Sequence, residues 1–353
     1  MAEEEQCCGC AALDADTEYN MGLHVGAIFI LFGASTLGTL LPIISAKVPF
    51  LSTRSIIIEW LMAFGFGVVI ATGFIHMMNE GIEMLSNPCL GEVVENYESL
   101  GLAVVLATVV VMHLIECESA VFFASKGTEP MLHSHGHAHG HSHGHAHSST
   151  SSPVVSVHAI TPNDNENPYA KIVVEPSDGS INALSVDHKK PVDAKRKLAV
   201  ILFELGVVFH SVIVGVDLGV TAGSEFKTLL AAMSFHQFFE GIAIGGSALN
   251  AMESIKQVMM LNLGFAITTP IGMVIGIAVR TTYSSTSTTA LWVQGILNCV
   301  AGGILLYTGL VELLTYQMTT NNEFLTRKAS QRFALYVALW MGAGLMALIG
   351  KWA

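Results

Sequence analysis

Hydrophobic residues in this chain gather into long stretches instead of alternating with polar ones. Eight stretches are long enough, at 1.5 Å per residue, to cross about 30 Å of hydrocarbon as helices. They lie near residues 22–46, 55–78, 101–125, 198–219, 229–249, 257–279, 289–315 and 333–352. Several are rich in glycine, which lets helices approach closely in lipid. The pattern predicts an all-α membrane protein with eight transmembrane helices.

The composition agrees with this pattern. Hydrophobic residues make up 52% of the chain and charged residues only 12%, about half of the charged fraction usual in soluble domains. The net charge of −12 argues against a nucleic-acid partner. The expected surroundings of the chain are therefore a lipid bilayer and cations.

Four regions follow from the spacing of the apolar stretches. An acidic, cysteine-containing segment (1–21) precedes three helices (22–125), and a polar loop (126–197) separates these from five more (198–353). The loop carries eight histidines that alternate with Ser, Gly and Ala: His133, His135, His137, His139, His141, His143, His145 and His147. Without an apolar face, the loop is predicted to be disordered. Imidazole suits Zn, Cu, Fe and Ni, so weak, exchangeable metal binding is favoured over an inert linker.

Basic residues predict the orientation, because cytosolic segments are enriched in Lys and Arg. Thirteen basic residues fall on one side: Lys47, Arg54, Lys126, Lys171, Lys189, Lys190, Lys195, Arg196, Lys197, Lys256, Arg327, Lys328 and Arg332. Only Lys227, Arg280 and Lys351 fall on the other. We therefore expect both termini outside and the histidine-rich loop in the cytosol. The plasma membrane is the expected location, with an internal membrane as the alternative.

The outer side should also hold most of the acidic excess. Between the second and third helices lie Glu80, Glu83, Glu92, Glu95 and Glu98, without a basic residue among them. They form either a solvated surface or a vestibule that concentrates cations. Four cysteines share this side: Cys7, Cys8, Cys10 and Cys89. A disulfide or a loose metal contact are both open there, whereas Cys117 and Cys299 fall inside spans and are expected to be small buried hydrophobes.

Three ionisable side chains lie near the middle of two apolar stretches. His210 is about 18 Å into the fourth, and His236 and Glu240 are about 10–17 Å into the antiparallel fifth. His236 and Glu240 are spaced i,i+4 and share a helix face. Such residues are costly at mid-bilayer, so a divalent-metal site is favoured over a structural hydrogen-bond cluster. Ser211 and Gln237 adjoin the histidines and are candidates for hydrogen bonds that fix the imidazole tautomers.

Motifs in most of the spans resemble those of the ZIP family of divalent metal transporters, in particular its plant-type iron and zinc branch. They are ATGFIH (71–76), HSV with Gly215 (210–215), HQFFEG (236–241), TTPIG (268–272), and GILN, AG and LVELL within 295–314. A histidine-rich loop between the third and fourth spans is also typical of the family. The resemblance implies that His210, His236 and Glu240 form the transport site.

Further roles are implied by the same resemblance. His76 and Glu80 correspond to an entrance pair at the outer end of the second span. Glu118 corresponds to an acidic residue linked to metal selection near the inner end of the third span, and Glu116 is close to it. Other branches carry a second, bridged metal site, but Ser211, Val214 and Gln237 stand at positions that form it, which favours one ion per site.

The resulting hypothesis is a transporter, not an enzyme, that carries Zn²⁺ or Fe²⁺ into the cytosol as substrate and uses no cofactor. Mn²⁺ and Cd²⁺ fit the same ligands. A membrane-embedded metalloenzyme with a two-His, one-carboxylate site is the alternative, although the sequence lacks a His-Glu-x-x-His pair. A metal sensor is a third reading. Faces that contain Gly342, Gly344 and Gly350 suit packing within the bundle or a homodimer.

Overall fold

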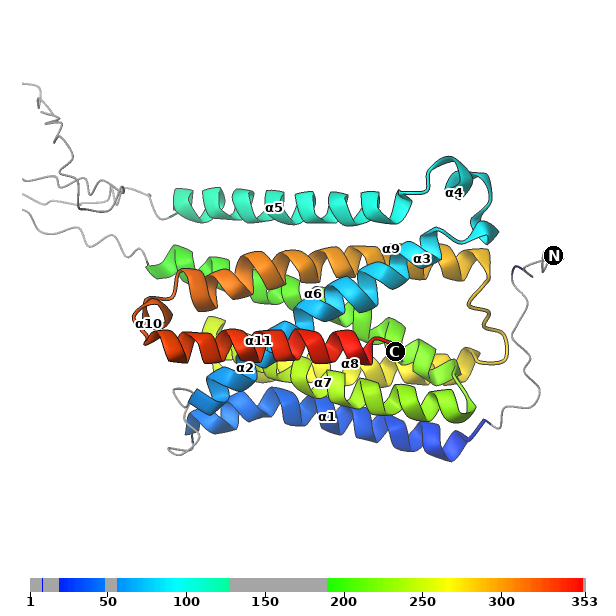
Figure 1. Ribbon diagram of the computed structural model, residues 1–353, viewed down its shortest axis with the longest axis horizontal. Coiled ribbons are helices and arrows are strands. Elements are labelled where there is room, and N and C mark those ends of the chain that lie inside the picture. The colour runs from blue at the N-terminus through cyan, green and yellow to red at the C-terminus, as the bar shows by residue number, and fades with distance from the viewer. Residues whose placement is uncertain (1–7, 9–18, 48–55, 127–188, 352–353) are drawn as a thin grey trace, which may run out of the picture.

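The computed structural model describes residue 8 and residues 19–47, 56–126 and 189–351, and this part of the chain is helical, without strands. Eight long helices run roughly parallel to one another (Figure 1). They are α1 (Met21–Lys47), α2 (Ile56–Ala71), α5 (Leu100–Lys126), α6 (Lys189–Val220), α7 (Gly223–Ala251), α8 (Ile255–Val279), α9 (Thr288–Tyr307) and α11 (Ala329–Ile349). Each corresponds to one of the eight predicted spans, so the predicted fold is confirmed.

Two boundaries differ from the prediction. The second span does not end at position 78, because α2 continues through a π-helical segment, η2 (Thr72–Met78), into α3 (Asn79–Leu85). The fourth begins at Lys189, inside the segment predicted to be a loop. The rest of that loop (127–188), with its eight histidines, lies outside the described residues.

Short helices complete the connections. The connection between α3 and α5 contains the 3₁₀ helix η3 (Pro88–Leu90) and the short helix α4 (Glu92–Asn96). After α9 follow two further π-helical segments, η4 (Thr308–Leu313) and η5 (Thr315–Thr319), and then α10 (Asn322–Leu325).

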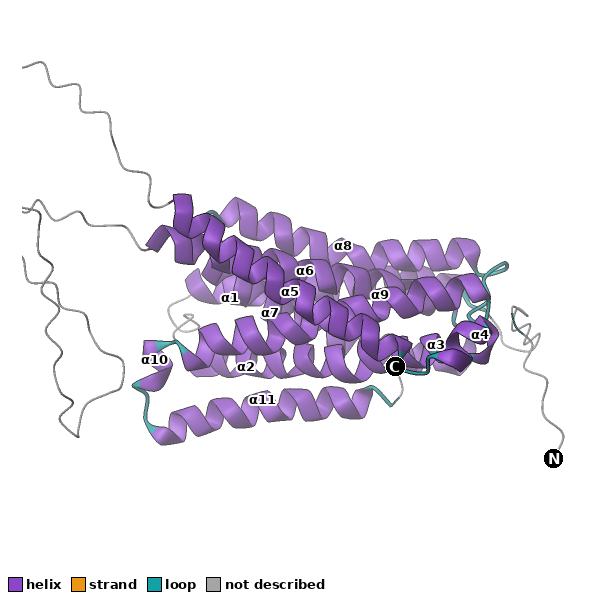
Figure 2. Cartoon of the chain, turned by 90° about the horizontal axis from the view of Figure 1, so that it is seen from above, coloured by secondary structure: helices purple, strands orange, loops and turns teal. Residues whose placement is uncertain are grey.

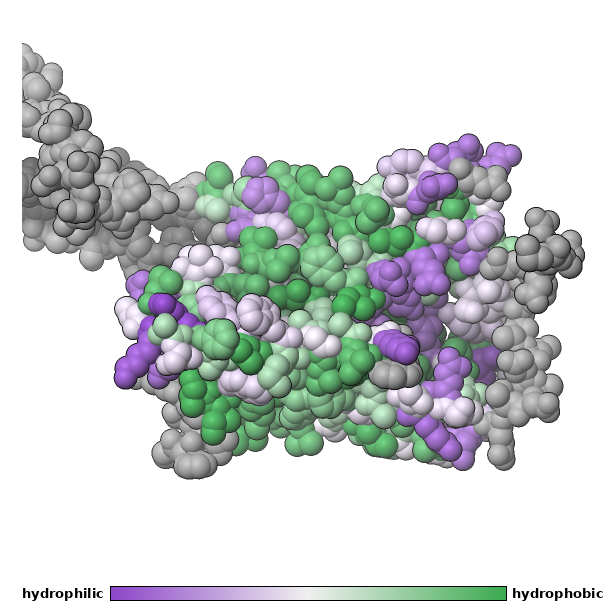
Figure 3. Space-filling model, in the orientation of Figure 1, coloured by the Kyte–Doolittle hydropathy of each residue, from purple (hydrophilic) through white to green (hydrophobic). Residues whose placement is uncertain are grey.

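Seven of the described helices are long and apolar enough to cross a membrane. The long helix missing from this set is α7, which carries His236 and Glu240 and packs against α1, α2, α6 and α8. The helix that carries two of the three predicted ligands is therefore enclosed by other helices. Hydrophobic residues cover most of the middle of the visible surface, and hydrophilic residues gather toward its two ends (Figure 3). This is the surface of an integral, multi-pass membrane protein.

By their contacts the helices form two groups: α1, α6, α7 and α8, and the continuous span α2–η2–α3 with α5, α9 and α11. α8 and α11 lie on opposite sides of the bundle (Figure 2). Glycines bring the helices of the first group close together. A Cβ on Gly272 would lie 2.3 Å from the Val212 carbonyl oxygen, and one on Gly276 would lie 2.3 Å from that of Val216. Neither position between α6 and α8 can therefore hold a side chain, as expected where small residues let helices pack tightly.

The C-terminal glycines behave differently from one another. A Cβ on Gly342 would meet the Phe64 carbonyl oxygen at 2.0 Å, so this glycine is used for packing between α11 and α2 within the bundle. Gly344 has no such neighbour within 4 Å.

The cysteines on the α3–α5 side form a disulfide, one of the two predicted alternatives. Cys8 is bonded to Cys89 and so ties the N-terminal segment to η3. Cys7 and Cys10 lie outside the described residues. Cys299 is buried, as predicted, but Cys117 is exposed on α5, so its predicted burial is wrong. The reason is that α5 packs on the bundle with a narrow face and leaves most of its surface outside.

Candidate metal site

Three ligand atoms from two helices meet inside the bundle. His210 on α6 and His236 and Glu240 on α7 each offer one ligand atom, and these atoms lie within 4.8 Å of one another. The two Nε2 atoms are 3.2 Å apart, and Nε2 of His236 is 3.2 Å from Oε2 of Glu240. All three side chains are buried. The spacing on α7 and the depth of His210 on α6 thus bring the predicted residues together.

The carboxylate of Glu240 lacks the partners that a buried charge requires. Its side chain is fully buried, yet neither oxygen accepts a hydrogen bond from a described residue. The contact of Oε2 with His236 has an ion-pair distance but not the geometry of a hydrogen bond. An unpaired carboxylate in such a place is strongly unfavourable. A divalent cation between the two imidazoles and the carboxylate would compensate for this cost.

Hydrogen bonds assign the tautomer of His236. Its Nδ1 faces two atoms, the Thr72 hydroxyl oxygen at 3.4 Å and the Met346 sulfur at 3.3 Å. The Thr72 hydroxyl already donates to the Val68 carbonyl oxygen at 2.9 Å, and a thioether can only accept. Nδ1 therefore carries the hydrogen, and Nε2 presents a lone pair to the site. Metal-binding histidines are commonly oriented in this way.

His76 adds a third imidazole beside the cluster. It lies in the π-helical segment η2, and its ring centroid is 5.3 Å from that of His210 and 6.3 Å from that of His236. Its Nε2 is buried and has no hydrogen-bond partner. Glu80, one turn further along, is only half-buried in α3. Because the helix continues to Leu85, Glu80 lies inside the helix and not at its outer end as expected.

The two residues predicted to fix the imidazoles do not do so in this structure. Gln237 donates to the hydroxyls of Ser35 at 3.2 Å and Thr269 at 2.6 Å, away from the histidines. The Ser211 hydroxyl is buried without a hydrogen-bond partner. Thr72 and Met346 hold His236 instead. Sequence reasoning missed both, and the position of Thr72 within ATGFIH was the one available signal.

The acidic residues of α5 lie apart from this cluster. The Glu116 carboxylate accepts a hydrogen bond from the Tyr307 hydroxyl, which also lies 3.0 Å from Nδ1 of His113. Glu118 is exposed on α5. The structure therefore brings neither of them to the three ligand atoms.

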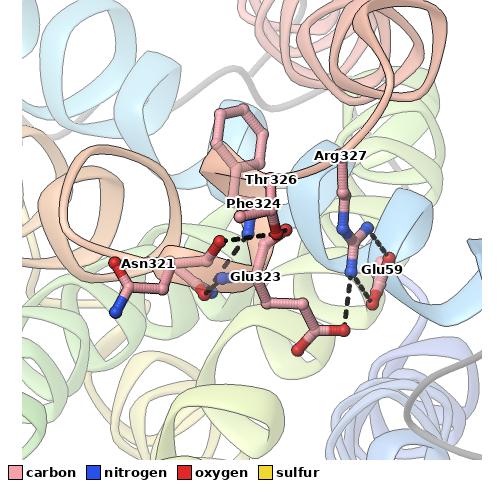
Figure 4. A network of polar contacts seen from close by, with 7 residues as sticks. Glu59, Asn321, Glu323, Phe324, Thr326 and Arg327 are labelled. Carbon is pink, nitrogen blue, oxygen red and sulfur yellow. Dashed lines mark hydrogen bonds and ion pairs between the residues drawn. The ribbon is translucent and has the colours of Figure 1, made fainter.

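A cavity of about 540 Å³ opens at the end of the bundle where α2, α6 and α11 begin and α7 ends. Polar side chains in its lining include Ser247 and Asn250 on α7, the same helix as His236. At its rim the Arg327 guanidinium forms ion pairs with the carboxylates of Glu59 and Glu323 (Figure 4). The two acidic residues at the rim are therefore paired with a basic side chain of the protein.

An all-helical, multi-pass membrane protein with a buried imidazole–carboxylate cluster where two helix groups meet belongs to the class of membrane metal transporters. Comparison with known protein families identifies the family of transporters. The family model of the ZIP zinc transporters matches residues 21–350. The chain belongs to this family.

Individual relatives agree over almost the full length of the chain. Zinc transporter 3 of Arabidopsis thaliana is 30% identical, over 98% of this chain and 90% of its own length. Zinc transporter 3 of Oryza sativa subsp. japonica is 32% identical, over 98% and 93% respectively. Zinc-regulated transporter 1 of Saccharomyces cerevisiae is 35% identical, over 95% and 88%. These relationships confirm the resemblance in the motifs and favour transport over the metalloenzyme alternative.

Proposed function

We propose that this protein carries divalent metal ions, zinc foremost, across the membrane into the cytosol, with the ion bound on its way by His210, His236 and Glu240. The convergence of these three ligand atoms within 4.8 Å inside the bundle is the observation that carries the proposal. Membership in the ZIP family and the names of the plant and yeast relatives support it independently.

Zinc is the first candidate because several relatives are named zinc transporters. Two imidazoles and a carboxylate also accept Fe²⁺, Mn²⁺ and Cd²⁺. One ion at this site is proposed, because Ser211, Val214 and Gln237 stand where other branches of the family carry the ligands of a second ion. None of the three offers a carboxylate or an imidazole.

The proposed path runs from the end nearer Glu80, past His76, to the end with the large cavity. Two observations support an outer position for the first end. The basic residues cluster at the other end, and the Cys8–Cys89 disulfide suits an oxidising compartment. In this orientation both termini would lie outside. Inward movement of two positive charges gains about 4–5 kcal/mol per 100 mV of inside-negative potential.

We propose four further assignments. The loop with eight histidines would hold released ions on the cytosolic side, and Glu116 and Glu118 would lie near the exit. The plasma membrane is the proposed location. The open face of Gly344 leaves room for close contact with a second copy.

Flux through purified protein in liposomes tests the function. Radioactive zinc should accumulate inside the vesicles, and unlabelled Fe²⁺, Mn²⁺ and Cd²⁺ added in turn should compete in proportion to their affinity. Zinc bound to the protein without accumulation in the lumen would instead support the metalloenzyme or the sensor.

A further inference from the structure

Asp217 is an acidic residue inside a predicted span, and it is not one of the three ligands of the proposed transport site. It follows His210 on α6 by seven residues, or about two turns, so the two side chains share a helix face. Glu80 follows His76 by four residues and likewise shares its face. The segment α2–η2–α3 and α6 both begin at the end with the large cavity. Asp217 and Glu80 therefore lie on the same side of the histidines, away from that cavity.

Neutral donors hold the Asp217 carboxylate in place. Gln294 on α9 donates from Nε2 to Oδ1 of Asp217 at 3.4 Å, and its own Oε1 accepts a hydrogen bond from the Tyr283 hydroxyl at 3.0 Å. Gln294 is buried, and Tyr283 lies on the connection between α8 and α9. The carboxylate is thus oriented from two other parts of the chain.

Glu80 lies near the same group. A Cβ on Gly81, the residue after Glu80, would lie 3.0 Å from the Gly295 carbonyl oxygen, so α3 packs on α9 next to Gln294. Burial raises the pKa of Tyr283, and the negative charges of Asp217 and Glu80 raise it further. No Lys or Arg among the described residues pairs with either one. Both carboxylates are half-buried, so their like charges repel each other, and a bound cation would remove that repulsion.

A second, independent feature marks this place as a ligand site. Nε2 of His76 is buried without a hydrogen-bond partner, one turn from Glu80, and the His76 ring lies against those of His210 and His236. A nitrogen ligand is therefore available between the carboxylates and the three-residue cluster. Oxygen ligands suit a partly hydrated cation, and imidazole suits zinc once water has been shed.

We propose that Asp217 and Glu80 form an outer cation site, in which Asp217 is a ligand held by Gln294 and Tyr283, and which passes a divalent cation to His76. This inference rests on the proposed transport function and adds Asp217 to the path. Because the outer site acts before the ion reaches His210 and His236, its loss weakens capture at low metal concentration and leaves the step at the inner ligands intact.

The test measures the concentration dependence of radioactive zinc uptake into liposomes for the wild type, Asp217→Asn and Glu83→Gln, at equal amounts of reconstituted protein. Asn keeps the shape and a hydrogen-bond acceptor for Gln294, whereas Glu83→Gln removes an equal charge from an exposed carboxylate beside Glu80. We expect Asp217→Asn to raise KM at least about tenfold and to leave kcat unchanged. Tenfold is the smallest loss of metal affinity usual when a residue that supports a bound metal is replaced. Glu83→Gln should leave KM unchanged.

A conservative variant and a double variant complete the design. Asp217→Glu restores a carboxylate and should bring KM back toward the wild-type value. Glu80→Gln combined with Asp217→Asn should raise KM by less than the product of the two single effects, because both act on one bound ion. Multiplicative effects would place the two residues in separate sites and overturn the proposal.

Three other results would also contradict it: an unchanged KM in Asp217→Asn, an equal rise in Glu83→Gln, or a fall in kcat at constant KM. An inactive wild type would instead refute the transport function itself, so the two failures are distinguishable.

Discussion

At the scale of single residues, the proton on His236 determines whether this side chain can bind a metal ion. Nδ1 gives its hydrogen to the Thr72 oxygen and the Met346 sulfur, which leaves a lone pair on Nε2. That lone pair faces Nε2 of His210 and the Glu240 carboxylate at 3.2 Å each. Three electron-rich atoms at such distances are stabilised by a cation among them.

The hydroxyl of Thr72 should therefore affect metal affinity without binding the ion. We expect Thr72→Val, which keeps the shape and loses the oxygen, to raise KM for zinc by about tenfold. Thr108→Val is the matched control, because the Thr108 hydroxyl donates to Val104 within α5. Uptake kinetics at equal protein levels decide the matter, and equal KM values for the two variants would disprove the role of Thr72.

The ligands could be predicted from the sequence, but their supports could not. His236 and Glu240 are one turn apart, and the depth of His210 follows from its place in its span. Thr72 and Met346 are 164 and 110 residues from His236, and single-sequence patterns do not show such contacts. Ser211 and Gln237 were expected to assist because they are neighbours in sequence. Adjacent residues on a helix point about 100° apart, so a neighbour faces elsewhere.

At the scale of helices, hydrophobicity predicts where the spans lie but not where they end. Glu80 and Glu83 interrupt the apolar pattern of the second span, yet the helix continues to Leu85. Lys195, Arg196 and Lys197 immediately precede the apolar stretch of the fourth span, yet α6 includes them and begins at Lys189. Backbone hydrogen bonds continue past the membrane boundary, because polar side chains there do not break a helix.

Glycines determine how closely α6 and α8 can approach each other. We expect Gly276→Ala to lower the melting temperature of the detergent-solubilised protein, at a cost of about 1–3 kcal/mol, because the added methyl would lie 2.3 Å from the Val216 carbonyl oxygen. Gly33→Ala on α1 is the control, since its Cβ would meet nothing within 4 Å. Similar melting temperatures for both variants would contradict close packing of α6 on α8.

At the scale of the whole molecule, the site separates two differently built ends. The histidine cluster lies between α6 and α7 of one helix group and η2 of the other. One end holds Asp217 and Glu80 without cationic partners. The other holds the large cavity, whose rim acids are paired with Arg327. Unpaired acids favour capture of a cation, and paired acids favour its release.

The histidine-rich segment should regulate transport without forming part of the path. Deletion of residues 133–147 is expected to preserve the initial uptake rate, because the three ligands belong to α6 and α7, which span residues 189–251. The response to high cytosolic metal should change, since neutral imidazoles bind metal near cytosolic pH. Flux before and after metal preloading, at matched surface levels, separates the two effects. A severe loss of initial flux would assign the segment to the path.

The central claim is that His210, His236 and Glu240 bind the transported ion. The most direct test is zinc flux into liposomes for His210→Ala, His236→Ala and Glu240→Ala, with His113→Ala on exposed α5 as the control. Each of the three variants should insert and melt normally but lose flux, while the control transports like the wild type. Near-normal flux from any one of the three would remove that residue from the site and contradict the account.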